Sequence, residues 1–203
     1  MDIIKGLMDI KAIQVNIDTP FVWASGIRAP IYCDNRKAIG HYELRHAIAL
    51  QLTDMIRKAF PTVALIGGTA TAGIPHATSV ADLMKLPMIY IRSTAKGHGT
   101  TSAIEGDFEK GTSVVIIEDL ISTGGSSLNC VEQVRSAGLE VLGVAAIFDY
   151  QLVDAAANFA RAGVPLHTLT NFTELEKKLQ LSAAQSEILK KWRTNPHDDS
   201  IWG

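Results

Sequence analysis

The chain is poor in cysteine and has no long apolar run. Its two cysteines, Cys33 and Cys130, have no CxxC spacing and cannot form a disulfide framework, so reduced thiols are the simplest interpretation. No apolar run reaches the roughly 18 residues that a membrane helix needs. The first residues, Met1–Lys5, lack the charged-then-apolar pattern of a signal peptide. We therefore expect a cytoplasmic protein with no membrane partner.

The chain also lacks an excess of positive charge. Its formal net charge of -2 argues against a broad positively charged surface that would bind nucleic acid, so we expect no nucleic-acid partner. Five of the histidines have no metal-site spacing, and we interpret them as surface or packing residues. These are His41, His46, His76, His167 and His197. We expect no metal ion that the protein holds by itself.

The apolar residues that are present follow a pattern of alternating strands and helices. With 203 residues, 47% of them hydrophobic and 20% charged, the chain is long enough for one domain with its own core. Strands that are apolar throughout and alternate with helices predict an α/β fold, with a central parallel sheet flanked by helices. In such a sheet ligands bind beyond the carboxyl ends of the strands.

The positions of these elements follow from apolar periodicity and from the Gly and Pro residues between them. The expected strands are residues 63–66, 87–91, 114–117, 141–148 and 166–169. The expected helices are a short amphipathic one within residues 1–15, 42–60, 73–84, one that ends near 137, 152–162, and one or two within 172–193. We expect residues 18–40 to be loop with short extended pieces, and the polar end from Thr194 onward to fray.

The strongest local signal follows the third expected strand. Glu118 and Asp119 come directly after residues 114–117, and Ser122–Ser126 reads Ser-Thr-Gly-Gly-Ser at the start of a helix. Glycines let the backbone approach an anion, and the free N–H groups of a helix start point toward a phosphate. The glycine spacing differs from that of a Walker A loop and from that of a dinucleotide fingerprint. We expect a phosphate-binding loop here.

The two acids distinguish this loop from other phosphate sites. Carboxylates beside a phosphate would repel it, unless they face sugar hydroxyls, a bound magnesium ion or a developing cation. The alternative is a solvated Glu-Asp pair that precedes a well-capped helix.

Two further segments have the composition of anion-binding loops. Residues 67–75, after the first strand, combine glycines with small hydroxyl residues, although an ordinary tight turn has the same composition. Arg92, Lys96 and His98 lie within seven residues and suit a lid over a polyanion, although a solvated surface loop is the alternative.

These motifs together resemble a known family. Residues 114–127 resemble the signature of the type I phosphoribosyltransferases, which bind 5-phosphoribosyl 1-pyrophosphate (PRPP). With residues 21–36, 68–75, 92–99 and 144–148 added, the chain resembles the orotate phosphoribosyltransferases over most of residues 18–150. The resemblance implies the type I phosphoribosyltransferase fold with a small N-terminal hood.

The resemblance also implies a domain organisation and a reaction. Residues 1–203 would be a single domain, with a hood and base-binding segment over about 1–40, a core over about 41–170, and C-terminal helices and tail over about 171–203. The 5-phosphoribosyl group of PRPP would pass to orotate, giving orotidine 5'-monophosphate and pyrophosphate in UMP biosynthesis. Mg²⁺, bound mainly through PRPP, would be the cofactor. The enzyme would be a homodimer whose lid loop reaches the neighbouring subunit's site.

Site residues are carried over onto matching positions of this chain. The resemblance implies that Lys96, His98 and Asp119 are catalytic and that Ser122 also touches orotate. It implies PRPP binding by Arg92, Lys96, His98, Glu118, Asp119, Leu120, Ile121, Ser122, Thr123, Gly124, Gly125 and Ser126. The pyrophosphate loop would be Thr69, Ala70, Thr71, Ala72 and Gly73.

The chain departs from relatives at three places where they carry basic residues. Many have another lysine in the lid, where this chain has Ser93 and Thr94, and some have one at Ala72. Some have an arginine that pairs with the orotate carboxylate where this chain has Tyr150. Our hypothesis is that Arg28 and Arg36 bind that carboxylate instead. Trp23 suits either the base pocket or the core.

Two rival functions stay open. One is a phosphoribosyltransferase that acts on a purine or on another pyrimidine, which a panel of bases would distinguish. The other is a non-catalytic regulator that binds PRPP and nucleic acid, but such proteins need a DNA-binding module or a basic RNA-binding face, and the sequence indicates neither.

Overall fold

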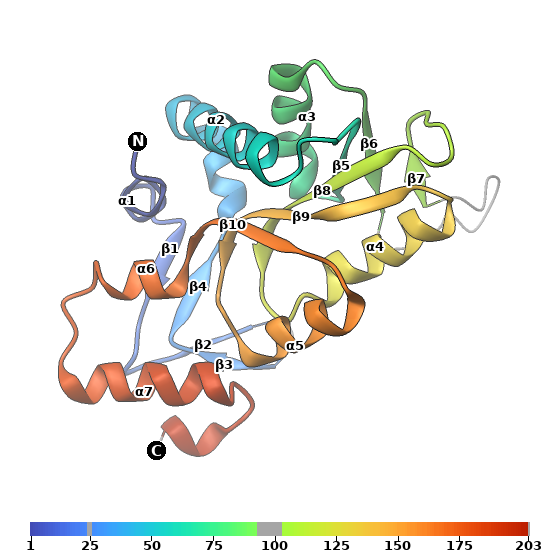
Figure 1. Ribbon diagram of the computed structural model, residues 1–203. Coiled ribbons are helices and arrows are strands. Elements are labelled where there is room, and N and C mark those ends of the chain that lie inside the picture. Colours follow the sequence, from blue (N-terminus) through green and yellow to red (C-terminus); the bar gives the residue numbers. More distant parts are fainter. Residues whose placement is uncertain (24–25, 93–102, 203) are drawn as a thin grey trace.

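The computed structural model describes residues 1–23, 26–92 and 103–202, and a six-stranded sheet forms its centre (Figure 1). The strand order is β10-β9-β8-β5-β6-β7, and every pairing is parallel except the antiparallel β6–β7 pair at the edge. The strands are β5 (Leu65–Thr69), β6 (Met88–Ile91), β7 (Ile104–Glu105), β8 (Ser113–Ile121), β9 (Glu140–Asp149) and β10 (Leu166–Asn171). The predicted α/β class with a mainly parallel sheet is confirmed.

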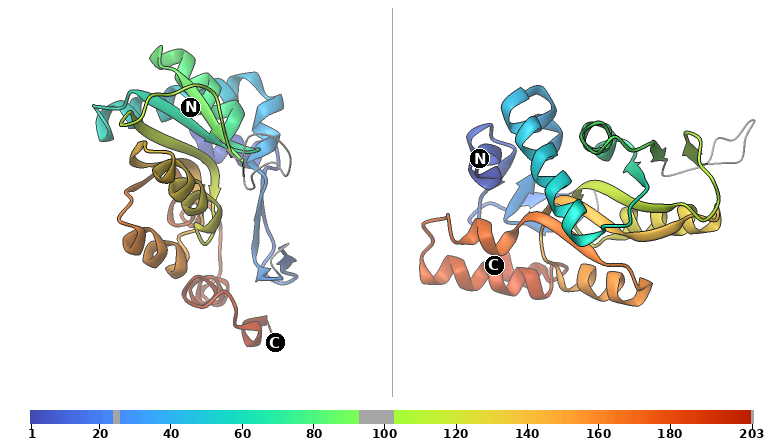
Figure 2. Two further views of the ribbon diagram at one scale, coloured as in Figure 1. Left: turned by 90° about the vertical axis from the view of Figure 1, so that its right-hand side faces the viewer. Right: turned by 45° about the horizontal axis from the view of Figure 1, so that its top comes forward.

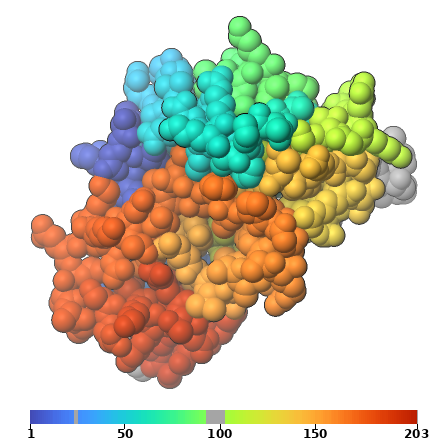
Figure 3. All heavy atoms as spheres, in the orientation of Figure 1, coloured from blue at the N-terminus to red at the C-terminus, as the bar shows by residue number. Residues whose placement is uncertain are grey.

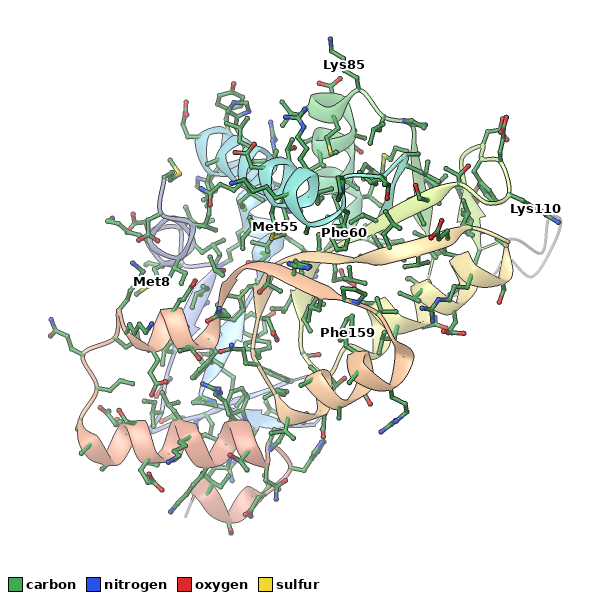
Figure 4. All side chains as sticks on the ribbon, in the orientation of Figure 1. Met8, Met55, Phe60, Lys85, Lys110 and Phe159 are labelled. Carbon is green, nitrogen blue, oxygen red and sulfur yellow. The ribbon has the colours of Figure 1, made fainter. Side chains whose placement is uncertain are left out.

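Helices cover both faces of this sheet. One face packs against α2 (Tyr42–Ala59) and α3 (Gly73–Met84), and the other against α4 (Gly125–Ser136) and α5 (Val153–Ala162). The side chains of residues 114–117 in β8 alternate between these two apolar clusters, as the pleat of a strand requires. Figure 4 shows Phe60 and Phe159 on opposite sides of the sheet. A strand buried on both faces must be apolar throughout, which explains the run at residues 114–117.

The order of the strands reverses beside β5. The chain passes from β5 to β6 on one side and then returns to place β8 on the other side. The carboxyl ends of β5 and β8 are therefore neighbours, and their following loops leave the sheet side by side. Ligands bind at such a switch point in open α/β sheets.

Residues 1–40 form a separate group of small elements, which we call the hood. Its strands pair as two antiparallel ribbons, β1 with β4 and β2 with β3, which extend away from the helix-covered sheet (Figure 2). The elements are α1 (Ile3–Asp9), β1 (Ile13–Val15), β2 (Phe21–Val22), β3 (Arg28–Ala29), β4 (Ile31–Cys33) and the 3-10 helix η1 (Asn35–Gly40). The short helix expected within residues 1–15 is α1, which ends before Lys11 takes a φ of 55° and a strand follows.

The C-terminal segment packs below the sheet (Figure 3). It contains α6 (Phe172–Glu176), α7 (Ala183–Thr194) and η2 (Asp199–Trp202). The expectation that the chain frays from Thr194 is wrong, because Ile201 and Trp202 pack against the larger apolar cluster. Fully buried Trp192 of α7 meets Trp23 of the hood edge to face, with ring centroids 5.7 Å apart.

Two strand boundaries also differ from the prediction. Gly67 and Gly68 were expected in a turn but lie inside β5, where both are buried. β8 continues past Ile117 to Ile121, so Glu118 and Asp119 lie within the strand. None of the helices in the described ranges is long and apolar enough to cross a membrane.

Candidate active site

The loop between β8 and α4 is shaped by one glycine. Gly124 has a φ of 80°, which favours a residue without Cβ, and a Cβ there would lie 2.7 Å from the ring of Phe159. Asn158 donates from Nδ2 to the main-chain oxygen of Thr123 at 3.0 Å, which holds the loop against α5. The loop leads into the first turn of α4, where N–H groups have no partner within the helix. This turn can therefore accept an anion.

Glu118 is buried and receives hydrogen bonds from three directions. Thr69 donates from Oγ1 to Glu118 Oε1 at 2.6 Å, and Ser127 donates from Oγ to Oε2 at 3.2 Å. The main-chain N–H of Asp119 donates to Oε1 at 3.1 Å. These donors fix the carboxyl group between β5, β8 and α4, so Glu118 connects the two loops of the switch point.

Asp119, the next residue, has a different environment. Burial and then the charge of Glu118 raise the pKa of Asp119 from 3.8 to about 7. The positive charge of Arg36 acts in the opposite direction, which places Arg36 near the acid pair. Asp119 can therefore exchange a proton near neutral pH, a property typical of functional sites.

The loop between β5 and α3 lies against β8. A Cβ at Gly73 would overlap the main-chain oxygen of Ile117 and lie 2.5 Å from Thr69 Oγ1. Ala70 donates its main-chain N–H to the oxygen of Ile91 at 2.7 Å, and the Ala70–Thr71 peptide bond is cis. The structure thus brings the expected pyrophosphate loop, residues 69–73, beside the acid pair.

Only the first residue of the expected lid is described. Arg92 Nη2 lies 3.3 Å from Glu105 Oε1, and its main-chain N–H donates to Ala103 at 2.9 Å. Lys96 and His98, the other expected basic residues of this segment, lie outside the described residues, as do Ser93 and Thr94.

The two candidate partners of the orotate carboxylate differ in position. Arg36 is largely exposed, and its Nε lies 2.6 Å from Asp34 Oδ1, in a pair that lowers the pKa of Asp34. Arg28 lies half-buried in β3 and has no hydrogen bond or ion pair to any residue described by the structure. Only Arg36 is therefore linked to the acid pair by its charge.

Trp23 and Tyr150 have packing roles. Their ring centroids are 4.7 Å apart, and Trp23 donates from Nε1 to the main-chain oxygen of Ile31 at 3.0 Å. The hydroxyl of Tyr150 accepts from the main-chain N–H of Cys33 at 3.0 Å. Tyr150 thus joins the hood to β9, at the position where some relatives carry an arginine. Of the two roles that the sequence left open for Trp23, in the base pocket or in the core, the structure favours the core.

Two expected PRPP-binding residues differ in their burial. Ile121 is fully buried in the cluster beside α4, so only its main-chain groups are left to contact a ligand. Leu120 is partly buried and packs against the opposite cluster.

Three residues that hold the site in place were absent from the sequence prediction. Ser127 and Asn158 bond to Glu118 and Thr123, and Asn35 donates from Nδ2 to the main-chain oxygen of Asp119 at 2.6 Å. Ser127 directly follows the predicted loop and could have been included with it. Asn35 lies within residues 21–36, which carry part of the family resemblance, but neither Asn35 nor Asn158 could be assigned its partner, because the partners are distant in the sequence.

Comparisons with known proteins agree with this geometry. Residues 42–158 match the family model of the phosphoribosyl transferase domain. The chain is 47% identical to the orotate phosphoribosyltransferase of Bacillus cytotoxicus over 203 residues, which cover 98% of this chain and 97% of that protein. It is 49% identical to that of Listeria monocytogenes over 201 residues, with coverages of 97% and 95%. The crystal structure of orotate phosphoribosyltransferase from Aeropyrum pernix is similar with a TM-score of 0.77 and 30% identity, over 87% of this chain and 97% of that one.

Proposed function

The chain belongs to the orotate phosphoribosyltransferases, and on this premise we propose how its residues transfer the 5-phosphoribosyl group of PRPP to orotate. The products are orotidine 5'-monophosphate and pyrophosphate, in pyrimidine biosynthesis. The observation that carries the proposal is the switch point, where an acid pair lies between two anion-binding loops whose positions are coupled through Glu118.

The two loops divide the phosphates of the donor between them. We assign the 5-phosphate to residues 122–126, because the first turn of α4 presents main-chain N–H groups there. We assign the pyrophosphate to residues 69–73, which leave the neighbouring strand. The side chain of Arg92 would place positive charge beside the pyrophosphate. Lys96 and His98, which lie outside the described residues, are proposed to do the same.

The acid pair is proposed to hold the ribose between these loops. In the reaction a ring nitrogen of orotate attacks the anomeric carbon while the bond to pyrophosphate breaks, and the sugar acquires oxocarbenium character. Carboxylates that accept hydrogen bonds from the ribose hydroxyls fix the sugar, and their negative charge stabilises the cationic transition state. Asp119 is proposed as the catalytic member because protein donors already surround Glu118.

Mg²⁺ is proposed to arrive with the donor. The charge distribution fits a cation here, because carboxylates lie beside two loops built for anions. Mg²⁺ commonly keeps waters and binds substrate phosphates rather than an all-protein cage. We assign it no ligand from this chain. When bound, the ion would offset charge on the departing pyrophosphate.

The homodimer and the closing lid remain part of the proposal. A lid formed by residues 92–99 that reaches the neighbouring subunit's site would exclude water from the activated sugar. We also propose that the enzyme works in the cytoplasm.

The test is orotate consumption by purified protein with PRPP and Mg²⁺, followed by ultraviolet absorbance. Uracil, adenine, hypoxanthine and xanthine serve as alternative bases. We expect Mg²⁺-dependent loss of orotate alone. Turnover of another base would reject the orotate assignment while leaving the phosphate sites, and PRPP binding without any turnover would favour a regulator.

A second test concerns the orotate carboxylate. We expect Arg36→Ala and Arg28→Ala to raise the KM for orotate, with the larger effect at Arg36 because its charge acts on Asp119. Loss of one charged hydrogen bond, about 1.5–3 kcal/mol, corresponds to roughly 10-fold or more in KM. An unchanged orotate KM in both variants would reject both candidates.

A further inference from the structure

A hydrogen bond from the hood reaches the acid pair. Asn35, at the start of η1, is fully buried, and its Nδ2 donates to the main-chain oxygen of Asp119 at 2.6 Å. The two residues are 84 positions apart in the chain. Asn35 therefore connects the hood to the end of β8. None of the binding roles proposed above involves this hydrogen bond.

The main-chain oxygen of Asp119 needs this donor because β5 is too short to supply one. β5 pairs with β8 only as far as Ile117, so the end of β8 has no strand on that side. Side chains contact the carbonyl groups at this end of β8. The hydroxyl of Thr69 lies 3.2 Å from the main-chain oxygen of Ile117, and the Asn35 amide donates to that of Asp119. Asn35 thus takes the place of the missing strand.

The orientation of the Asn35 amide is fixed from its other end. Cys33 donates from Sγ to Asn35 Oδ1 at 3.2 Å. Burial and the charges of Asp119 and Asp34 raise the pKa of Cys33, so its thiol keeps the proton that it donates. A flipped amide would turn its oxygen toward the carbonyl of Asp119 and lose both hydrogen bonds.

From this geometry we infer that Asn35 is a positioning residue, which sets the main chain of Asp119 and thereby the direction in which the acid pair faces the ribose. This inference rests on the proposed role of Glu118 and Asp119 in binding the ribose hydroxyls. It predicts that Asn35 controls discrimination between sugars without touching the sugar itself.

The experiment compares two sugars that differ by one hydroxyl group. Ribose 5-phosphate and 2-deoxyribose 5-phosphate are measured as competitive inhibitors against PRPP, and the ratio of their inhibition constants is the readout. For the unaltered enzyme we expect the ribose compound to bind roughly 10-fold more tightly, as for one hydrogen bond to a charged group. In Asn35→Ala and Asn35→Leu we expect the ratio to fall to about 2-fold or less, since neither side chain has a hydrogen-bond donor.

Thr170→Val is the matched control. Thr170 is buried and donates from Oγ1 to a main-chain oxygen of the sheet, that of Ile147, at 2.9 Å. Its loss should lower the melting temperature as a buried hydrogen bond does, without changing the inhibition ratio. Asn35→Leu nearly keeps the side-chain volume and leaves no cavity, so it tests the inference even where Asn35→Ala folds poorly.

The outcomes distinguish a failure of the inference about Asn35 from a failure of the proposed role of the acid pair. If the unaltered enzyme prefers ribose and both Asn35 variants keep that preference, the inference is overturned while the acid pair keeps its role. If the unaltered enzyme does not distinguish the two sugars, the acid-pair assignment fails, and this inference fails with it. Loss of the preference in both Asn35 variants, with Thr170→Val unchanged, supports the inference.

Discussion

The two loops of the switch point begin alike and are held in different ways. Each follows a buried strand, contains glycine and leads into a helix. In the loop after β5, Gly73 is needed because the main chain of β8 leaves no room for a Cβ. In the loop after β8, Gly124 is needed because the backbone turns through a positive φ.

The two loops have similar compositions, but their glycines are needed for different physical reasons. The close approach at Gly73 is a contact between the start of α3 and β8, which are distant in sequence, so it fixes one loop relative to the other. The turn at Gly124 is a local requirement, to which the ring of Phe159 adds a tertiary constraint. Changes in the first loop should therefore disturb the sheet, whereas changes in the second should disturb mainly the phosphate site.

The largest effect is expected for Gly73→Ala. The added methyl group would meet the main-chain oxygen of Ile117, which is inside the sheet and cannot move aside as a side chain can. Overpacking of this kind costs about 3 kcal/mol, and we expect both the melting temperature and the activity to fall. Thermal unfolding by circular dichroism measures the first.

Gly40→Ala is the control for this variant. A Cβ at Gly40 would have no atom within 4 Å, so the free energy of unfolding should change by no more than about 0.5 kcal/mol. Equal melting temperatures for Gly73→Ala and Gly40→Ala would show that the loop after β5 is not held by close approach.

An intermediate effect is expected for Gly124→Ala. A left-handed backbone costs an alanine about 1–2 kcal/mol, and Phe159 must also shift. We expect a rise in the KM for PRPP, because the first turn of α4 would move relative to the 5-phosphate. Titration with urea and steady-state kinetics measure the two effects.

Gly125→Ala sharpens this comparison. The nearest atom to a Cβ at Gly125 would be Thr123 Oγ1 at 3.8 Å, so the free energy of unfolding should stay the same or rise slightly. If Gly125→Ala destabilised the protein as much as Gly124→Ala, the positive φ would not be the cause.

The smallest loss of stability is expected for Asp119→Asn, which should instead be more stable than the unaltered protein at alkaline pH. The pKa of Asp119 is raised from 3.8 to about 7, so the folded state keeps a proton that the unfolded state has lost in that range. Stability of the unaltered protein therefore falls as pH rises from about 4 to about 7 and levels off above it. At about 1.4 kcal/mol per pKa unit, we expect the variant to be more stable at pH 8 by on the order of a few kcal/mol, with a lower kcat.

The pH dependence provides the check on Asp119→Asn. Urea titrations at pH 4.5 and pH 8 should show a much larger stabilisation at the higher pH. A variant that is less stable than the unaltered enzyme at pH 8 would show that the carboxylate of Asp119 is favourably bound in the folded protein.

Much of the fold and part of the site could be predicted from local pattern. Apolar runs that alternate with helical periodicity indicated the parallel sheet, and the loops rich in small residues marked the ends of β5 and β8. The short helix within residues 1–15 could be predicted from its apolar spacing, but the strand that follows it could not, because the turn at Lys11 depends on a positive φ. The tail was expected to fray because its polar residues outnumber Ile201 and Trp202, whose partners lie elsewhere in the chain.

The sequence by itself determined which chemical groups end the strands: a Glu-Asp pair, hydroxyls and glycines placed where the backbone leaves the sheet. Only the tertiary structure decided how they are used. Glu118 turns toward Thr69 and Ser127, and the carbonyl of Asp119 turns toward Asn35. The physical reason is that these contacts depend on the order of the strands, and the contacts with Thr69 and Asn35 join residues 49 and 84 positions apart. The periodicity of apolar residues predicts which face of a helix or strand is buried, but it does not predict which distant element covers that face.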